Sequence, residues 1–181
     1  NHRSLALGAF VLLFGGAQGQ FAPAIAVHPS GSDLQLHAVD MDGDGDLDMA
    51  GLFTGQQFRW FENTDGLGTF GGAQLITDVG AFCSLFDFAD LNGDGLADLV
   101  VVEDNDDEVL VVWNLGGGAF GAPVLLGVTT GESSALRIAE LTGDGIPDIV
   151  LALYSGSSGD IGWYAGNGTG FGPLVVAGLA I

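Results

Sequence analysis

Hydrophobic and polar residues alternate over short stretches along most of the chain, which is typical of β-strands with one buried and one exposed face. The alternating segments are 34–39, 84–89 and 134–139, and apolar runs follow at 49–53, 99–102 and 149–153. Third strands are predicted at 58–62, 109–113 and 161–164, and Gly-rich turns then lead to fourth strands opened by Phe70, Phe120 and Phe171. After residue 19 no segment has a helical period, so the chain is predicted to be all-β.

The strand pattern itself repeats every 50 residues or so. Four antiparallel strands at this period are the blade of a β-propeller, which predicts units at about 34–76, 84–126 and 134–177. Phe21 precedes the series Phe70, Phe120 and Phe171 by the same interval, so residues 20–27 are expected to form a lone outer strand. Closed propellers need about four to eight blades. Three blades plus a strand therefore indicate part of a larger propeller, with self-association as the lesser alternative.

An acidic loop recurs between the first and second strands of each unit, at 40–48, 90–98 and 140–148. Each loop carries oxygen-bearing side chains at positions 1, 3, 5 and 9 and glycine at positions 4 and 6, an arrangement that suits a hard cation such as calcium. Position 12 is Gly51, Val101 or Leu151 and lacks the bidentate acid of a helix-loop-helix calcium hand. The alternative is that the loops are acidic turns without a metal.

These loops, the period and the segments Phe70-Gly71-Gly72-Ala73 and Phe120-Gly121-Ala122-Pro123 resemble FG-GAP (VCBS-type) repeats, as in integrin α-subunit propellers and many secreted bacterial proteins. The resemblance covers nearly all of residues 20–181. It implies calcium held by side chains at loop positions 1, 3, 5 and 9 and by the position 7 carbonyl. Those residues are Asp40, Asp42, Asp44, Asp46 and Asp48; Asp90, Asn92, Asp94, Leu96 and Asp98; and Glu140, Thr142, Asp144, Ile146 and Asp148. The third site is expected to be weakest, because Glu140 is longer than Asp and Thr142 is neutral.

The net charge of the chain and its N-terminal residues argue against some classes of function and favour others. The 181 residues include 23 acids, three arginines and no lysine, for a net charge of −20, so nucleic acid and anionic membranes are poor partners. The acidic run 103–108 is interpreted as a solvated hairpin tip rather than a further metal site. Residues 1–19 have the basic start, apolar run and small residues of a signal peptide, which predicts a secreted or cell-surface protein with no membrane insertion of the mature chain. Cys83, the lone cysteine, is expected to be a small buried hydrophobe.

No convergent set of catalytic residues stands out. His37, Asp87 and Arg137 lie three residues before their loops, and we interpret them as polar residues lining a wet channel in preference to a ligand site. The third-strand aromatic residues are interpreted as between-blade packing rather than a sugar-stacking platform; they are Trp60, Phe61, Trp113, Trp163 and Tyr164. Asn167-Gly168-Thr169 has the form of a glycosylation acceptor, but a Gly-rich turn explains it equally well.

The favoured interpretation is a secreted, calcium-stabilised propeller module for protein or glycan binding or for cell adhesion, without catalysis. One alternative is the propeller of a carbohydrate-active enzyme similar to polysaccharide lyases. A lyase site would have to lie elsewhere, because the chain has no lysine and two arginines after residue 19. The other alternative is a structural spacer within a large surface protein, which binds calcium but no ligand.

Overall fold

The computed structural model describes residues 35–53, 56–155 and 158–178, and within these ranges every regular element is a β-strand. All of them belong to one unit, residues 33–181. The predicted signal peptide (1–19) and lone outer strand (20–27) lie outside the described residues. In the part of the chain that the structure describes, no helix is long and apolar enough to cross a membrane.

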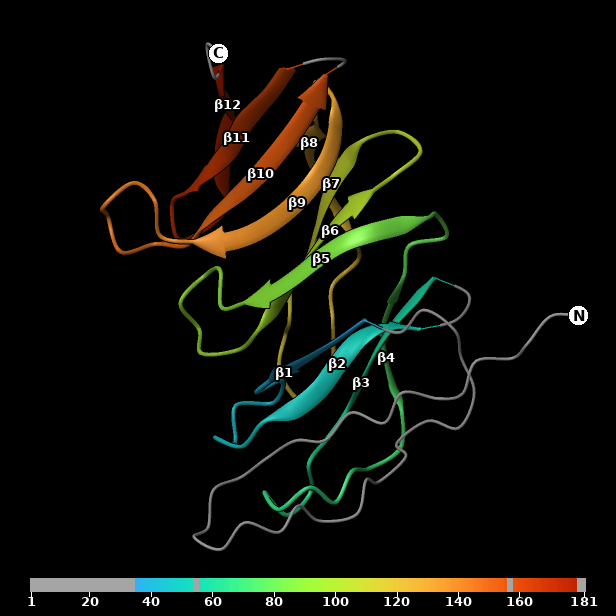
Figure 1. Ribbon diagram of the computed structural model, residues 1–181. Coiled ribbons are helices and arrows are strands. Elements are labelled where there is room, and N and C mark those ends of the chain that lie inside the picture. Colours follow the sequence, from blue (N-terminus) through green and yellow to red (C-terminus); the bar gives the residue numbers. More distant parts are fainter. Residues whose placement is uncertain (1–34, 54–55, 156–157, 179–181) are drawn as a thin grey trace, which may run out of the picture. The chain divides into compact units, whose positions relative to one another are not determined.

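Twelve strands form three four-stranded antiparallel sheets, and in each sheet the strands follow one another in sequence order (Figure 1). Blade 1 contains β1 (Gln35–Val39), β2 (Asp48–Phe53), β3 (Gln57–Phe61) and β4 (Gln74–Asp78). Blade 2 contains β5 (Cys83–Ala89), β6 (Asp98–Glu103), β7 (Glu108–Val112) and β8 (Val124–Val128). Blade 3 contains β9 (Glu132–Ala139), β10 (Asp148–Ser155), β11 (Ser158–Gly166) and β12 (Phe171–Gly178). The predicted all-β class and the repeat of four antiparallel strands are confirmed.

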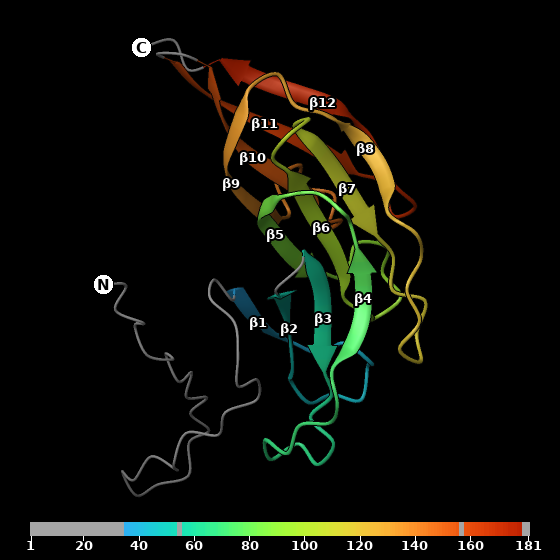
Figure 2. The ribbon, with the colours of Figure 1, turned by 90° about the vertical axis from the view of Figure 1, so that its right-hand side faces the viewer.

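Two hydrophobic cores join neighbouring blades. In blade 1, Ala50 and Leu52 of β2 pack with Phe86 and Leu99 of blade 2. The opposite face of blade 2 packs on blade 3 through a core that contains Val100, Val102, Val109, Val111, Leu136, Ile149 and Leu151. Because both faces of blade 2 are covered, every residue of β6 is buried. Figure 2 shows blade 2 between the other two blades. Each large side chain buried in this way contributes about 1.5–3 kcal/mol.

The cores follow chain order, joining blade 1 to blade 2 and blade 2 to blade 3. Neither core joins the first blade to the third among the described residues. The three blades are therefore an open part of a propeller. The sequence analysis predicts this, because three repeats are too few to close a ring.

Fourth strands of blades 1 and 2 begin later than the sequence pattern predicts. Phe70 and Phe120 form isolated bridges with Asn63 and Asn114, and the strands themselves begin at Gln74 and Val124. Three residues separate each bridge from the strand that follows, 71–73 in blade 1 and 121–123 in blade 2. In blade 3 the corresponding strand begins at Phe171, as predicted.

Side chains interpreted as packing residues are largely buried. Trp60, Phe61 and Tyr164 are at most 4% exposed, and Trp60 and Tyr164 belong to the two inter-blade cores. Cys83 is buried, and burial raises the pKa of its thiol to about 12, which agrees with a structural role. Trp60, Tyr164 and the partly buried Trp113 therefore pack between blades, whereas Phe61 and Trp163 belong to neither of the two inter-blade cores.

The acidic run 103–108 forms the tip of the β6–β7 hairpin, with Glu103 paired to Glu108. Residues 104–106 are exposed, as the solvated-tip interpretation predicts, whereas Glu103 is buried. The Glu103 carboxylate accepts hydrogen bonds from the backbone N–H groups of Asn105 and Asp106 and from the Asn105 side chain. Glu103 thus closes the hairpin instead of facing solvent.

Candidate metal centre

Each acidic loop joins the first strand of a blade to the second, and its shape depends on two glycines. In loop 1 (40–48), Gly43 and Gly45 have φ angles of 82° and 93°; loops 2 (90–98) and 3 (140–148) repeat these values within 10°. This left-handed backbone is strained for residues with a side chain. Glycines at positions 4 and 6 therefore turn the chain back so that the remaining side chains can face one centre.

The acid at position 1 stabilises the turn from within. Asp40 accepts hydrogen bonds from Gly43 N at 2.7 Å and Gly45 N at 3.0 Å, and Asp90 makes the same pair at 2.7 and 2.9 Å. Glu140 accepts from Gly143 N and from Asp144 N. The longer side chain of Glu140 thus closes the first part of its turn, and its bonds come from positions 4 and 5, whereas Asp40 and Asp90 also accept from position 6.

Position 9 is an aspartate in all three loops, and it is almost fully buried: Asp48, Asp98 and Asp148 are 1%, 0% and 0% exposed. One oxygen of each accepts from the N–H at position 2 of its own loop, at 2.8–3.1 Å. The other oxygen accepts a 2.8 Å bond from the N–H of Asn63, Asn114 or Gly166, which lie at the end of the third strand or two residues beyond it. Position 9 therefore fastens the loop to the blade, a role that the metal prediction overlooked.

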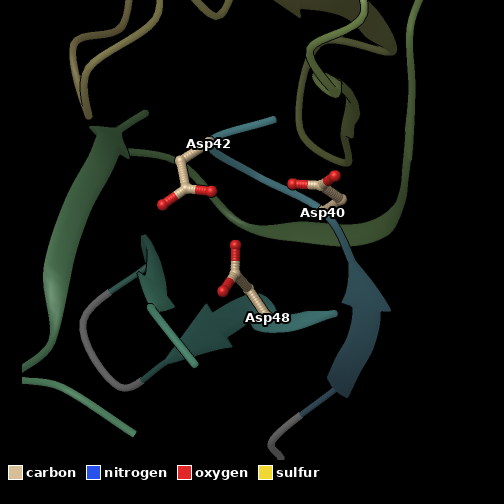
Figure 3. A group of neighbouring side chains, drawn as sticks. All are labelled: Asp40, Asp42 and Asp48. Atoms are coloured by element: carbon tan, nitrogen blue, oxygen red, sulfur yellow. The ribbon is translucent and has the colours of Figure 1, made fainter. Parts of the chain in front are cut away.

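In loop 1 three of the predicted ligands converge. Asp40, Asp42 and Asp48 each offer a carboxylate oxygen within 4.8 Å of the other two, and Figure 3 shows the three side chains facing a common space. Oxygen ligands lie about 2.3–2.6 Å from a calcium ion, so two of them on one ion are separated by at most about 5.2 Å. The spacing of the three oxygens satisfies this limit, and the residues fit a calcium ion.

Charge within loop 1 is poorly compensated by the protein. Burial, and after it repulsion from Asp44, Asp42 and Asp40, raises the pKa of Asp46, and its Oδ1 is buried with no hydrogen-bond partner. Burial also raises the pKa of Asp48, although two backbone N–H groups oppose this shift. A bound cation would offset both effects by favouring the charged carboxylates.

Loop 2 has the same backbone conformation as loop 1 but a different set of candidate ligands. Asn92 replaces the acid at position 3, and its amide nitrogen donates to Asp94 Oδ2 at 3.0 Å while its Oδ1 accepts from Asp94 N at 2.9 Å. Burial raises the pKa of Asp98 to about 6, against the hydrogen bonds from Asn114 and Leu91. Asn92 can still offer its amide oxygen to a cation, so loop 2 retains a neutral ligand where loop 1 has a charged one.

Loop 3 departs furthest from loop 1. Thr142 stands at position 3, and its N–H donates to Asp148 at 3.0 Å. Glu140 and Leu141 are exposed, whereas Met41 and Leu91, the residues equivalent to Leu141, are buried. Among the described residues, loop 1 is the one group of three acidic, histidine or cysteine side chains with oxygen, nitrogen or sulfur atoms close enough to share an ion.

The remaining predicted ligands lie at positions 5 and 7. Each position 5 acid accepts a hydrogen bond from the N–H at position 7, at 2.9–3.0 Å: Asp44 from Asp46, Asp94 from Leu96, and Asp144 from Ile146. These bonds hold the second half of every loop in one conformation. The three loops are thus built alike even where their side chains differ.

Two asparagines that the sequence analysis did not single out support the loops. Asn63 donates from Nδ2 to the Leu47 carbonyl at 3.2 Å. Asn114 donates from Nδ2 to the carbonyls of Met41 at 2.8 Å and Ala97 at 3.2 Å, so it links loop 1 to blade 2. Both asparagines immediately precede the Gly-rich turn before the fourth strand, and this recurrence was the available signal.

The residues three positions before each loop connect neighbouring first strands. His37 Nδ1 lies 3.5 Å from Asp87 Oδ1, and Asp87 Oδ2 accepts from Ile138 N at 3.3 Å. The His37 ring also lies 5.1 Å from the ring of Phe86, centre to centre. Arg137 donates to the carbonyl of Leu136. Asp87 therefore joins β1 and β9 across β5 through polar contacts.

Four-stranded antiparallel blades that stack through apolar faces and carry an acidic loop after the first strand define a protein of the β-propeller class. A family model described as FG-GAP-like repeat matches residues 40–101 and 90–151, and each match runs from one acidic loop into the second strand of the following blade. The chain belongs to the FG-GAP-like repeat family. The resemblance inferred from the loops and the 50-residue period is confirmed.

Two solved structures with a similar fold belong to different kinds of protein, a lectin and a toxin. A lectin of Agrocybe aegerita, described by its specific recognition of non-reducing terminal N-acetylglucosamine, has a TM-score of 0.51 and 23% identity over 77% of this chain and 50% of the lectin chain. The Photorhabdus luminescens Tc holotoxin pore has a TM-score of 0.52 and 27% identity over 81% of this chain and 7% of the toxin chain. The chain thus spans half of the lectin and a small part of the toxin. A comparison with curated proteins gave no match.

Proposed function

We propose that this chain is a calcium-stabilised, extracellular β-propeller module that binds a protein or glycan without catalysing a reaction. The observation that carries the proposal is the convergence of Asp40, Asp42 and Asp48, with one oxygen from each within 4.8 Å of the other two. Loop 1 is the strongest site, loop 2 follows with Asn92 as a neutral ligand, and loop 3 is the weakest.

Calcium suits these loops better than magnesium does. The candidate ligands are carboxylate, amide and hydroxyl oxygens on a turn, and calcium accepts six to eight such oxygens in flexible geometry, whereas magnesium demands a near-ideal octahedron and keeps its waters. Extracellular modules bind calcium with dissociation constants of about 10⁻⁴ to 10⁻³ M. A cation in loop 1 neutralises acids that otherwise repel one another, and so stabilises the connection between β1 and β2.

The binding role rests on the family and on the fold. FG-GAP-like repeats form the described chain from loop 1 to β10, and a lectin of known sugar specificity has a similar fold. A fold does not determine a ligand. The similarity to the lectin therefore selects the first ligands to test, which are glycans ending in N-acetylglucosamine.

Thermal unfolding of the chain in calcium, in magnesium and in chelator tests the metal proposal. One site at a hundredfold excess over its dissociation constant stabilises the folded state by about 2.7 kcal/mol. Asp42→Ala is expected to lose most of the contribution of loop 1. Asp106→Ala is the matched control, because it removes the same charge from the exposed β6–β7 tip, away from the loops. Equal calcium shifts in both variants would contradict the assignment.

Binding to an array of glycans, in calcium and in chelator, tests the second half of the proposal. Retention of N-acetylglucosamine-terminated glycans in calcium, lost on chelation, would support a calcium-dependent lectin module. A calcium-induced rise in unfolding temperature without any glycan retained would leave the metal sites standing and redirect the search to protein ligands.

A further inference from the structure

Asparagine followed by glycine occurs twice in the chain, at Asn92-Gly93 in loop 2 and at Asn167-Gly168 in the turn between β11 and β12. The side-chain carbonyl carbon of an asparagine is open to attack by the backbone nitrogen of the next residue. Glycine hinders this attack least, because it has no Cβ. The attack closes a succinimide ring, which water then opens. These two dipeptides are therefore the candidate sites of spontaneous deamidation.

The other asparagines of the described residues lack a requirement for this reaction. Asn63 and Asn114 are each 1% exposed and are followed by threonine and leucine. Asn105 is exposed but is followed by aspartate. Asn92, in contrast, is half-buried and is followed by an exposed glycine, Gly93, so water has access to the dipeptide.

The two Asn-Gly dipeptides have similar local geometry. In each, the asparagine Oδ1 accepts a hydrogen bond from the N–H two residues later, at 2.9 Å from Asp94 and at 3.0 Å from Thr169. The glycines also match, with φ angles of 80° for Gly93 and 79° for Gly168. A difference in reactivity between the two sites must therefore come from their surroundings.

A carboxylate contacts the attacking nitrogen at one of the two sites. Asp90 Oδ1 accepts a hydrogen bond from Gly93 N at 2.7 Å. Among the described residues, no side chain accepts a hydrogen bond from Gly168 N. A backbone nitrogen attacks a carbonyl carbon only as it loses its proton, and a base within hydrogen-bond distance can accept that proton. Loop 2 thus combines the reactive dipeptide with a positioned proton acceptor.

We propose that Asn92 is a site of spontaneous deamidation, with Asp90 as the proton acceptor. Gly93 N gives its proton to Asp90 and bonds to Asn92 Cγ. The Cγ–Nδ2 bond breaks, and the side-chain nitrogen leaves as ammonia with the transferred proton. Water then opens the ring at either of its carbonyl carbons, which forms aspartate or isoaspartate at position 92. Both products carry a carboxylate, so loop 2 gains one negative charge.

The consequence for the metal site rests on the calcium binding proposed above. The aspartate product gives loop 2 an acid at position 3, as Asp42 does in loop 1, and calcium affinity depends on the number of charged ligands. The isoaspartate product adds one carbon to the main chain before Gly93 and disturbs the turn that this glycine makes. Deamidation therefore divides loop 2 into a population that binds calcium more tightly and one that binds it more weakly.

Peptide mass spectrometry of the whole chain, incubated in chelator at neutral pH and sampled over time, compares the two sites within the same molecules. Asn92 is expected to convert at least about tenfold faster than Asn167, which is less than the about 10²–10⁴-fold typical of general acid–base catalysis. Asp90→Asn keeps an oxygen that can accept from Gly93 N, but an amide is a far weaker base. This variant is expected to reduce the rate at Asn92 to that at Asn167.

Two results would overturn the proposed reaction. One is an Asn92 that converts no faster than Asn167 in the wild-type chain. The other is an Asn92 that converts equally fast in wild type and in Asp90→Asn. Circular dichroism verifies that Asp90→Asn folds, and if it does not, the comparison within the wild-type chain decides the result because it needs no variant.

Asn92→Asp tests the effect on calcium binding separately. Calcium is expected to raise the unfolding temperature of this variant, relative to chelator, by more than it raises that of wild type. Asn167→Asp is the matched control, because it adds the same charge outside the three loops and its carboxylate can still accept from Thr169. A calcium-induced rise in Asn92→Asp no larger than in this control would refute the gain at loop 2. A wild-type chain that does not respond to calcium would refute the proposed function, whereas the rates in chelator test the deamidation independently of it.

Discussion

Asn114 provides the sharpest test of how one blade supports the loop of another. Its side chain is 1% exposed and takes part in three hydrogen bonds: to the carbonyls of Met41 and Ala97, and from Gly116 N. Each such bond contributes about 0.5–1.5 kcal/mol net, so Asn114→Ala is expected to lower the free energy of unfolding by about 1.5–4.5 kcal/mol. The bond to Met41 crosses from blade 2 to blade 1.

Asn63→Ala is the control that separates the cross-blade bond from the rest. Asn63 is also 1% exposed, but its side chain takes part in two hydrogen bonds, both within blade 1, with the Leu47 carbonyl and with Gly68 N. The two variants lose the same atoms in equally buried positions. Asn114→Ala is therefore expected to cost about 1 kcal/mol more, the contribution of one hydrogen bond.

Urea unfolding, followed by circular dichroism and by tryptophan fluorescence, measures both variants in chelator so that metal binding does not contribute. Coincidence of the two signals is required before free energies are compared. If Asn63→Ala costs as much as Asn114→Ala or more, the contact between Asn114 and Met41 does not stabilise the pair of blades, and the reasoning is refuted.

Three further changes probe the loop chemistry, the strand packing and the hairpin tip. Asp94→Ala is expected to lower the unfolding temperature in millimolar calcium and to have little effect in chelator; equal effects would exclude a metal role for loop 2. Gly51→Ala is expected to cost at least about 2 kcal/mol in urea unfolding, because its Cβ would press into the Gln35 carbonyl across β1–β2, and a neutral result would contradict that close approach. Burial alone would raise the pKa of Glu103, but hydrogen bonds from Asn105 and Asp106 hold it below its usual value. The carboxylate therefore contributes stability above its unfolded pKa, about 4.3, that is lost as pH falls through the lower folded value. Acid titration should cost wild type more stability than Glu103→Gln, and identical pH profiles would argue against this role.

The fold could be predicted to a large extent because the same pattern of strands and acidic loop occurs in three successive repeats. Alternation of apolar and polar residues predicted the first strand of each blade, apolar runs predicted the second, and the recurrence of the loops gave the period. The start of the fourth strand in blades 1 and 2 was predicted too early, because Phe70 and Phe120 pair only in single bridges and the continuous ladders begin at Gln74 and Val124. Periodicity shows where strands can form, but it does not show where the backbone pairing becomes continuous.

Less of the candidate site could be predicted. The positions that bring Asp40, Asp42 and Asp48 together follow from spacing and from two glycines, so the converging trio agrees with the predicted ligands. The backbone bonds of Asp48 and the contact from Asn114 to loop 1 depend on tertiary packing, between residues 15 and 73 positions apart. Such bonds leave no local pattern, except that an asparagine recurs at the same place in two blades.

The buried aspartate at position 9 has a consequence for how these repeats can change over time. Because Asp48, Asp98 and Asp148 fasten their loops through backbone N–H groups, the loops keep one backbone conformation although position 3 differs among them. A repeat is therefore free to exchange an acid for Asn92 or Thr142 without losing its architecture. Under the proposed calcium binding, affinity would differ from blade to blade within one chain, and the sites would fill in order at different cation concentrations.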